Sequence, residues 1–415
     1  MKKGFMNSIV RIFATISCVA FLAGCNSSDN EPDVNNRKDI DLPVSSRATA
    51  EELQSFYTRF TIDAINWNNS NQEIQNKNVI VSPLSASMLL GMLANGTDQV
   101  VAKQITDYLG ISDLEALNEL SHNLLVSLPT VDSKSKIEIS NSIWNSNDWK
   151  LNSNYTSVMS EKFRASSSSI DFGNPAAAET INKWIENKTN GIINSYYDFI
   201  EPSTILVILN TLYYKGEWAD EAFNPKNTKQ ETFYGLNNNS TVSMMHSEKI
   251  HSTYAKTDNY EACVIPFGNT AFSMTLVLPN KESFNTENFR VITDQEIADL
   301  NGLAVYENVK INLPKFMINH KLNLKEVLNF AGLNTLNGLI PLKMFENEVE
   351  RGINLEQGAS LSIDEKGAEV AVVSNGEVIM GAAPSKTMVF DHPFYFFITE
   401  RSTGACILSG FIADL

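Results

Sequence analysis

The sequence lacks the short motifs that carry most enzyme chemistry. Its 415 residues contain no GxGxxG, P-loop, HExxH, CxxC or GxSxG pattern. The five histidines are scattered, and the nearest pair, His246 and His251, would point to opposite faces of a strand. A Ser-His-Asp triad needs no adjacent residues, but nothing in the sequence favours one. We therefore expect no metal site, no cofactor and no enzyme activity.

Cysteine is also scarce, with four in the whole chain. Cys18 and Cys25 belong to the N-terminal segment described below, whereas Cys263 and Cys406 lie in the strand-like runs EACVIPF and GACILSGFI. A disulfide between the latter two is compatible with an exported protein. We expect two buried free thiols instead, because both runs are apolar.

Positive charge is in short supply. There are 32 basic against 48 acidic residues, a net charge of −16. A surface that binds nucleic acid must be basic, so this balance excludes nucleic acid as a partner. The excess of negative charge favours solubility.

The N-terminus has the pattern of a signal peptide. Lys2, Lys3 and Arg11 precede an apolar run, Ile12 to Leu22, which is too short to span a membrane and ends in Leu-Ala-Gly-Cys. This ending resembles the lipobox of bacterial lipoproteins, in which cleavage leaves Cys25 as a lipidated N-terminus. We predict a signal peptide over residues 1–24 and a lipid on Cys25; the alternative is an ordinary signal peptide with a chance cysteine.

Residues 25–48 are polar and contain few large apolar side chains. This composition predicts a disordered tether between the lipid and a folded domain. We expect an exported protein that is anchored to the membrane by its lipid, at the outer membrane or the cell surface. Acidic residues just after Cys25 give a weak indication of surface export.

From residue 49 to 415 we find no second linker and no internal repeat, which predicts one large α+β domain. Apolar spacings of three and four predict helices in the first half of it. Ser82 and Pro83 have the residue types of a helix start, and Asn95-Gly96 of a helix end. The near-continuous apolar run Ile205 to Tyr214 predicts a strand covered on both faces. Other predicted helices span 100–109, 113–128, 153–163 and 176–188, and further predicted strands are FSMTLVLP, VKINLPKF, HPFYFFIT and GACILSGFI.

The stretch Asp364 to Phe394 is harder to assign. From Ala368 to Met380 every second residue is small or apolar, the period of a half-buried strand. The run then enters Gly-Ala-Ala-Pro without a tight hairpin signal. The pattern alone therefore allows the segment to be either a strand or a long loop.

Several segments together resemble the serpin family, the superfamily of serine protease inhibitors. They are NVIVSPLSASMLLGMLANGT, INKWIENKTNGII, LNTLYYKGEWADEAF, VKINLPKF, DEKGAEVAVV and FDHPFYFFI. The resemblance covers essentially all of residues 49–415. It implies an α+β serpin fold with three β-sheets, eight to nine helices and an exposed reactive-centre loop at about 366–390. Insertion of such a loop into a sheet is a known form of strand addition and would explain why the loop has strand patterning.

The resemblance also implies a function. A target protease cleaves the loop, the loop inserts into sheet A before the acyl-enzyme hydrolyses, and the protease is trapped. The scissile region is Met380, Gly381 or Ala382, since counting sixteen residues from Glu365 gives Gly381 and counting eleven back from Pro393 gives Ala382. These residues suit elastase-like or chymotrypsin-like serine proteases, with cysteine proteases as a further class. The alternative is a serpin-fold binding or structural lipoprotein that never inserts its loop.

Other residues match family positions. Glu365 and Lys315 match an ion pair at the loop root, and Trp218 matches a tryptophan under the top of sheet A, the breach. Ser82, Ser85 and Asn210 match the shutter, a polar cluster between the central strands, where Gln357 stands in place of the usual histidine and should remove titration near neutral pH. We expect the protein to be a monomer whose partner is the target protease. The hinge of the loop comprises Glu365, Gly367, Ala368, Val370 and Val372, and its inward face carries no charge or proline.

Overall fold

The structure is a computed structural model that describes residues 39–71, 77–219, 222–281, 290–353, 355–368 and 386–415. Two groups of predictions therefore lie outside the described residues. One is the signal peptide with its lipidation site Cys25, and the other is the segment holding Val370, Val372, Met380, Gly381 and Ala382.

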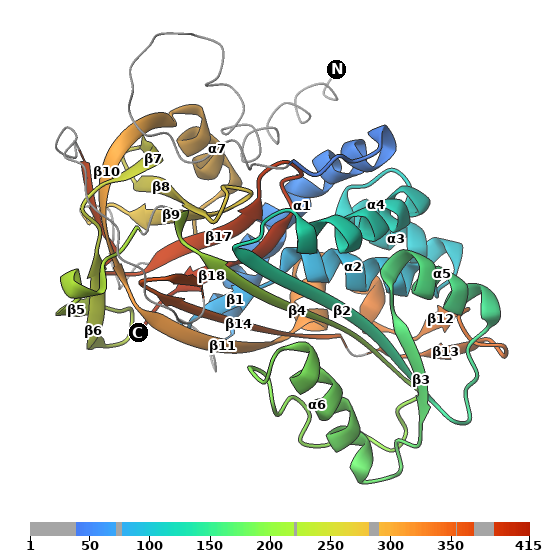
Figure 1. The fold of residues 1–415 in the computed structure, drawn as a ribbon. Coiled ribbons are helices and arrows are strands. Elements are labelled where there is room, and N and C mark those ends of the chain that lie inside the picture. Colours follow the sequence, from blue (N-terminus) through green and yellow to red (C-terminus); the bar gives the residue numbers. More distant parts are fainter. Residues whose placement is uncertain (1–38, 72–76, 220–221, 282–289, 354, 369–385) are drawn as a thin grey trace.

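Within the described part of the chain, eight α-helices surround three sheets (Figure 1). The predicted α+β class is thereby confirmed, including the number of sheets and the range of helices. The helices are α1 (Val44–Ser70), α2 (Pro83–Ala94), α3 (Gln99–Leu109), α4 (Leu114–Ser127), α5 (Ser153–Phe163), α6 (Ala176–Lys188), α7 (Asp294–Gly302) and α8 (Leu324–Phe330), with 3-10 turns at Leu128–Thr130, Pro225–Asn227 and Asn334–Asn337.

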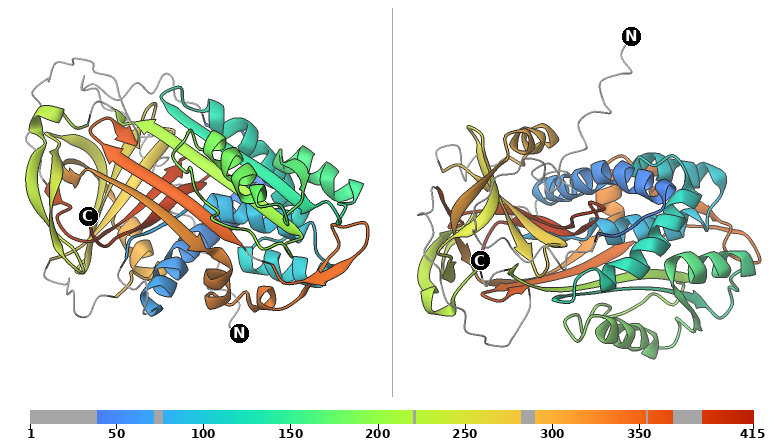
Figure 2. Two further views of the ribbon diagram at one scale, coloured as in Figure 1. Left: turned by 90° about the horizontal axis from the view of Figure 1, so that it is seen from below. Right: turned by 45° about the horizontal axis from the view of Figure 1, so that its top comes forward.

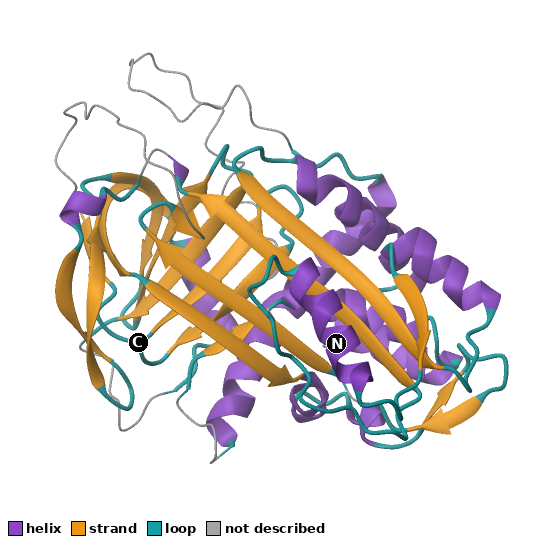
Figure 3. Ribbon diagram, turned by 60° about the horizontal axis from the view of Figure 1, so that its bottom comes forward, coloured by secondary structure: helices purple, strands orange, loops and turns teal. Residues whose placement is uncertain are grey.

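A six-stranded sheet forms one broad face of the molecule (Figure 3). Its strand order is β11-β14-β15-β4-β2-β3. The strands are β11 (Phe316–Asn323), β14 (Glu356–Asp364), β15 (Gly367–Ala368), β4 (Leu206–Glu217), β2 (Ser135–Ser146) and β3 (Ser166–Ile170).

A ten-stranded sheet curls behind it, in the order β1-β18-β17-β9-β8-β7-β10-β6-β5, with β16 paired to β10. A third sheet contains β12 and β13. The bounds are β1 (Val79–Val81), β5 (Lys229–Tyr234), β6 (Asn239–His246), β7 (Ile250–Lys256), β8 (Tyr260–Phe267), β9 (Phe272–Pro279), β10 (Val305–Pro314), β12 (Ile340–Leu342), β13 (Val349–Arg351), β16 (Lys386–Val389), β17 (Phe394–Glu400) and β18 (Cys406–Ile412).

The central helix α2 is buried along its whole length. Ser82 caps it by accepting a hydrogen bond from the backbone of Ser85, and Pro83 occupies its first turn, as the sequence predicts. Strand β4 lies between α2 on one face and α6 on the other. Its apolar run is therefore covered on both sides, as expected, and Figure 2 shows α6 lying over the outer face of the sheet.

The predicted tether boundary at residue 48 is wrong, because residues 39–48 are part of the fold. Helix α1 begins at Val44, and Ile40 and Leu42 are buried. The Ile40 amide donates to Ser402 Oγ at 3.0 Å, and Asp39 pairs with Arg401. The polar composition of this segment gave no signal for burial, because a small polar residue, Ser46, enters the core alongside Ile40 and Leu42.

Cys263 and Cys406 are both free and buried, which confirms the preferred prediction. Burial raises the pKa of the Cys263 thiol strongly and that of Cys406 to about 12. Both thiols are therefore protonated and unreactive in the folded protein.

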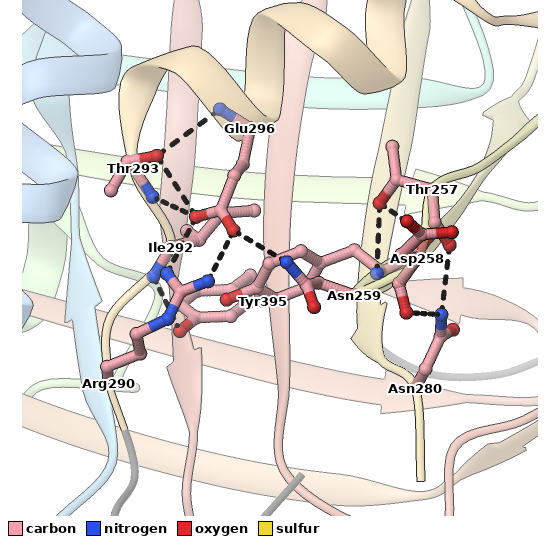
Figure 4. Close-up of polar contacts among 10 residues, drawn as sticks. Thr257, Asp258, Asn259, Asn280, Arg290, Ile292, Thr293, Glu296 and Tyr395 are labelled. Carbon is pink, nitrogen blue, oxygen red and sulfur yellow. Dashed lines mark hydrogen bonds and ion pairs between the residues drawn. The ribbon is translucent and has the colours of Figure 1, made fainter. Parts of the chain in front are cut away.

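Helix α7 is fixed by a group of charged and polar residues that serves the fold (Figure 4). Thr293 and Glu296 form a capping box, and Arg290 donates two hydrogen bonds to the Glu296 carboxylate at 2.8 and 2.5 Å. The hydrogen bonds from Arg290 lower the Glu296 pKa to about 2. The Ile292 amide donates to the Tyr395 hydroxyl and ties this corner to β17.

In the part of the chain that the structure describes, no helix has the length and apolar character needed to cross a membrane.

Candidate functional site

The six-stranded sheet contains an incomplete strand at its centre. Strand β15 is two residues long, and Gly367 and Ala368 each pair with β14 on one side and with β4 on the other. Among the described residues, β14 and β4 are joined through β15 rather than directly. Beyond Ala368 the two long strands thus border a position that one further strand could fill. We call this position the gap.

A cavity of about 150 Å³ lies at the gap. It is bounded by strand residues on both sides and by the loop that follows α6. The lining residues are Leu212, Tyr213 and Tyr214 of β4, Ser360 and Ser362 of β14, Met317 of β11, and Thr189, Ile192 and Ile193 of the loop.

Gly367 is required at the entrance to the gap. Its φ of 141° is a conformation that other residues rarely adopt, and a Cβ there would lie 2.0 Å from the Gly216 carbonyl oxygen. Close approach of the two backbones at this point lets β15 pair with β4.

At the root of β15, Lys315 and Glu365 form the ion pair that the resemblance implies. Lys315 Nζ lies 2.7 Å from Glu365 Oε2, and Thr228 Oγ1 donates to Glu365 Oε1 at 2.7 Å. Burial acts to raise the Glu365 pKa, but the hydrogen bonds from Lys315 and Thr228 outweigh it and lower the pKa below its ordinary value. The carboxylate is therefore held in its charged form.

Trp218 holds the turn that carries Glu365. Its ring stacks on Phe267 with centroids 4.5 Å apart. The indole Nε1 donates to the Asp364 carbonyl at 2.8 Å, and the Trp218 amide donates to the Lys366 carbonyl at 2.7 Å. Both neighbours of Glu365 are thereby fixed by one buried residue.

Lower in the sheet, Gln357 bridges β14 to the start of α2. Its Oε1 accepts from the Ser82 amide at 2.8 Å, and its Nε2 donates to the Ser82 carbonyl at 2.9 Å. The Ser82 hydroxyl is 2.9 Å from that of Ser85. Three of the four predicted shutter residues thus form one connected group, and glutamine satisfies both of its polar atoms there.

Asn210 does not join this group, contrary to what the shutter match implied. Its Nδ2 donates to Asn141 Oδ1 of the neighbouring strand β2 at 2.7 Å. Its Oδ1 is buried and has no hydrogen-bond partner among the described residues. A buried acceptor without a partner is uncommon and costs free energy. It lies on the β4 border of the gap, across from Gln357.

Sequence reasoning missed His320. This residue of β11 reaches β1, where its Nδ1 lies 3.0 Å from the Ile80 carbonyl oxygen, two residues before Ser82. Burial lowers the His320 pKa in spite of the hydrogen bond to Ile80. The prediction about titration concerned Gln357 alone and did not consider this titratable neighbour. The sequence carried no signal for it, because the contact joins residues 240 positions apart.

A model of the family described as "Serpin (serine protease inhibitor)" matches residues 56–415. The chain belongs to the serpin family. Human neuroserpin is 28% identical over 360 residues, which cover 81% of this chain and 86% of that protein. An uncharacterized serpin-like protein of Thermococcus kodakarensis is 28% identical over 410 residues, covering 94% and 96% of the two chains. The native state of tengpin, a thermophilic serpin, has a similar structure with a TM-score of 0.75 at 24% identity, covering 93% of this chain and 99% of tengpin.

Serpins are generally protease inhibitors, and some members are non-inhibitory. In this serpin the structure brings together Lys315, Glu365 and Trp218 at the top of the gap and Ser82, Ser85 and Gln357 below it. The two separated histidines of the sequence analysis do not converge: His246 pairs with Glu231 at 2.7 Å, and His251 stacks against Tyr306.

Proposed function

We propose that this serpin is a suicide-substrate inhibitor of serine proteases that acts by inserting its cleaved loop into the gap. The observation that carries the proposal is the two-residue strand β15, which already pairs with both borders of a strand position that no other described residue fills. Insertion would extend pairing that has begun, so no rearrangement of β15 itself is needed.

The pairing of β15 defines where the following residues would go. Continuing both registers by two residues places Val370 between Leu361 and Tyr214, and continuing by four places Val372 between Ala359 and Leu212. Leu361, Ala359 and Tyr214 are buried against the body of the protein. The apolar face of the loop sequence would therefore enter the core.

The next inward position falls at the shutter. The same registers place Ser374 between Gln357 and Asn210. A hydroxyl there could donate to the unpartnered Asn210 Oδ1. Ser374 of the inward face would thus arrive beside a border residue that has an unused acceptor.

The energy available is large. Burying Val370, Val372, Val378 and Met380 releases roughly 6 to 12 kcal/mol, at about 1.5 to 3 kcal/mol each. New ladder hydrogen bonds add about 1 kcal/mol apiece. This rivals the roughly 5 to 15 kcal/mol stability of an ordinary domain and is enough to displace a covalently attached protease.

The covalent chemistry belongs to the protease. Its nucleophile bonds to the carbonyl carbon of the scissile residue, Met380, Gly381 or Ala382, and the peptide C–N bond breaks, releasing the new amino terminus. Insertion then precedes attack of water on the acyl bond. Small or apolar residues at this position favour elastase-like or chymotrypsin-like enzymes over trypsin-like ones, and cysteine proteases use the same acyl chemistry.

The test is incubation with an elastase-like protease followed by denaturing electrophoresis. We expect an adduct that survives SDS and a cleaved loop within residues 380–382. Cleavage without any adduct, over a panel of elastase-like and chymotrypsin-like enzymes, would support the alternative of a non-inhibitory serpin-fold binding or structural protein.

We also propose that the protein is an exported lipoprotein, anchored through Cys25 at the outer membrane or the cell surface and monomeric there. The Leu-Ala-Gly-Cys sequence supports this. Cys25→Ala should release the protein from the membrane fraction or leave the precursor unprocessed. Cys18→Ala is the matched control, because Cys18 would leave with the signal peptide. Full processing and membrane retention of Cys25→Ala would overturn the proposal.

A further inference from the structure

The loop between α6 and β4 lies across the gap. Figure 3 shows α6 and this loop in front of the long strands. On one side of the gap, α6 and the loop pack against β2 and β4, where Ile181 and Ile200 share a core with Trp144 and Leu209. Any strand that entered the gap would have to pass beneath the loop.

Asn182 ties the loop to α6. Asn182 Oδ1 accepts from the amides of Tyr196 and Tyr197 at 3.0 and 2.8 Å, and its Nδ2 donates to the Tyr197 carbonyl at 2.7 Å. Displacement of the loop therefore carries these two tyrosines together.

On the far side of the gap, Lys321 of β11 fastens the loop. Its Nζ donates to the Tyr196 carbonyl at 2.9 Å and lies 4.6 Å from the centroid of the Tyr196 ring. Glu356 of β14 orients the ammonium group at 3.3 Å. Lys321 is paired in register with Gly358, and a Cβ on Gly358 would lie 2.7 Å from the Tyr196 ring. The ring thus rests directly on the glycine backbone of β14.

We propose that Lys321, Tyr196 and Gly358 form a latch that holds the loop over the gap and limits the rate at which a strand can enter. The regulatory role rests on the proposed insertion mechanism. By the register extended above, Val373 would pair with Gly358 and reach the outward face beside the residue on which the Tyr196 ring rests. The Lys321 contacts must break before insertion passes this level.

The latch can be tested without a protease. A fluorescein-labelled synthetic peptide with the sequence of residues 368–380 should enter the gap of the native protein, and its uptake can be followed by fluorescence anisotropy. Lys321→Met keeps the aliphatic stem but removes one hydrogen bond, the cation–π contacts with the Tyr196 and Tyr197 rings, and one partly exposed ion pair. From the usual sizes of these contacts we expect uptake roughly tenfold faster than in the wild type.

Lys136→Met is the matched control. Lys136 also lies on this sheet, pairs with Glu138 at 2.8 Å, sits 5.3 Å from the Tyr213 ring and is 51% exposed, the same fraction as Lys321. In the described part of the chain Lys136 contacts residues of the sheet and not the loop over the gap, so the uptake rate of Lys136→Met should equal that of the wild type. Gly358→Ala is an independent variant that pushes the ring off β14 while keeping Lys321, and it should also accelerate uptake.

Equal uptake rates in wild type, Lys321→Met and Gly358→Ala would overturn the latch. So would failure of all variants to take up peptide. The protease adduct of the wild type decides the proposed function separately: an adduct with unchanged uptake rates refutes the latch alone, whereas faster uptake in Lys321→Met without any adduct refutes only the inhibitory function.

Discussion

Glu365 is a charged residue in a largely buried place, since only 11% of its side chain is exposed. Its charge is stabilised by Lys315 and Thr228 at the point where the chain enters β15. Removing Lys315 or Thr228 leaves the buried Glu365 carboxylate without one of these two side-chain partners. The contacts of Glu365 therefore contribute to the stability of the sheet before any loop has inserted.

Lys315→Met should lower the stability of the native protein by about 1 to 2 kcal/mol, because hydrogen bonds to charged groups contribute about that much after allowance for the partly exposed lysine. The measurement is the midpoint of the first unfolding transition in denaturant. Lys343→Met, which removes an exposed pair with Glu348, should change it by less than about 0.5 kcal/mol. Equal losses of stability in the two variants would show that the Lys315–Glu365 pair contributes no more than an exposed ion pair.

The same site predicts an acid dependence. The Glu365 pKa is lowered in the folded state, so its contribution is complete above the ordinary value near 4.5 and is lost as the pH falls through the folded pKa. Glu365→Gln removes this term. The difference in stability between wild type and Glu365→Gln should therefore shrink between pH 6 and pH 3, and a difference that stays constant would contradict this.

His320 predicts a dependence of the same direction at higher pH. Burial lowers its pKa from the ordinary 6.5, so protonation opposes folding and stability falls as the pH drops below about 6.5. His320→Gln has no such titration. Comparing the two proteins at pH 7.5 and pH 5 checks this: the wild type should lose more stability, and an equal loss would show that folding does not lower the pKa of His320.

These residues also show what the sequence can and cannot reveal. Lys315 and Glu365 were predictable because each lies in a recognisable family segment with a fixed partner. Asn210 matched its family position equally well, yet its side-chain amide donates to Asn141 on the neighbouring strand. The partner of a side-chain amide depends on the exact positions of the neighbouring side chains, which residue identity does not specify.

At the scale of elements, apolar periodicity and capping residues predicted most helices of the first half to within a few residues. Helix α6 occupies the predicted 176–188, and α5 the predicted 153–163. Strand β2 was missed because its segment SKIEISNSIWNS is rich in polar residues, several of which are buried between β4 and neighbouring elements. Tertiary packing overrides the local pattern there.

Helix α4 predicts how the protein responds to sulfated polysaccharide. Some family members are accelerated by such a polymer bound along a basic helix that matches this one, but α4 contains no Lys or Arg. The nearby Lys162 of α5 is already paired with Glu115 and Glu119 of α4. We expect heparin to change the rate of protease inhibition less than about twofold, since the required positive field is absent. A tenfold acceleration would refute this.

At the scale of the whole molecule, the described residues leave a strand position between β14 and β4 beyond Ala368, and the sequence that follows Ala368 carries strand patterning. The sequence shows the patterning, and the family resemblance gives its meaning. The structure adds the register of β15, which fixes the borders that each loop residue would meet. Residues 369–385 lie outside the described part of the chain, so the scissile bond remains a prediction from spacing.

A substitution at Val370 tests the proposed insertion and its register most directly. Before cleavage, the proposed mechanism leaves Val370 outside the sheet, so Val370→Asp should change native stability by no more than about 0.5 kcal/mol. After cleavage, the carboxylate would have to enter between Leu361 and Tyr214, where an unpaired buried charge costs several kcal/mol. Insertion would slow, the acyl-enzyme would hydrolyse first, and the inhibitor would become a substrate that is cleaved near Gly381.

Ala371→Asp is the control for this change, because the same charge would then point to the outer face of the sheet. Titration of an elastase-like protease should show a high stoichiometry of inhibition for Val370→Asp and a smaller increase for Ala371→Asp. Thermal unfolding of the uncleaved proteins checks that neither variant disturbs the native fold. If Val370→Asp inhibits as well as the wild type, then either the strand enters one residue out of the register set by β15, or the loop does not insert at all. A stronger defect in Ala371→Asp would indicate the first, because a shift of one residue exchanges the two faces.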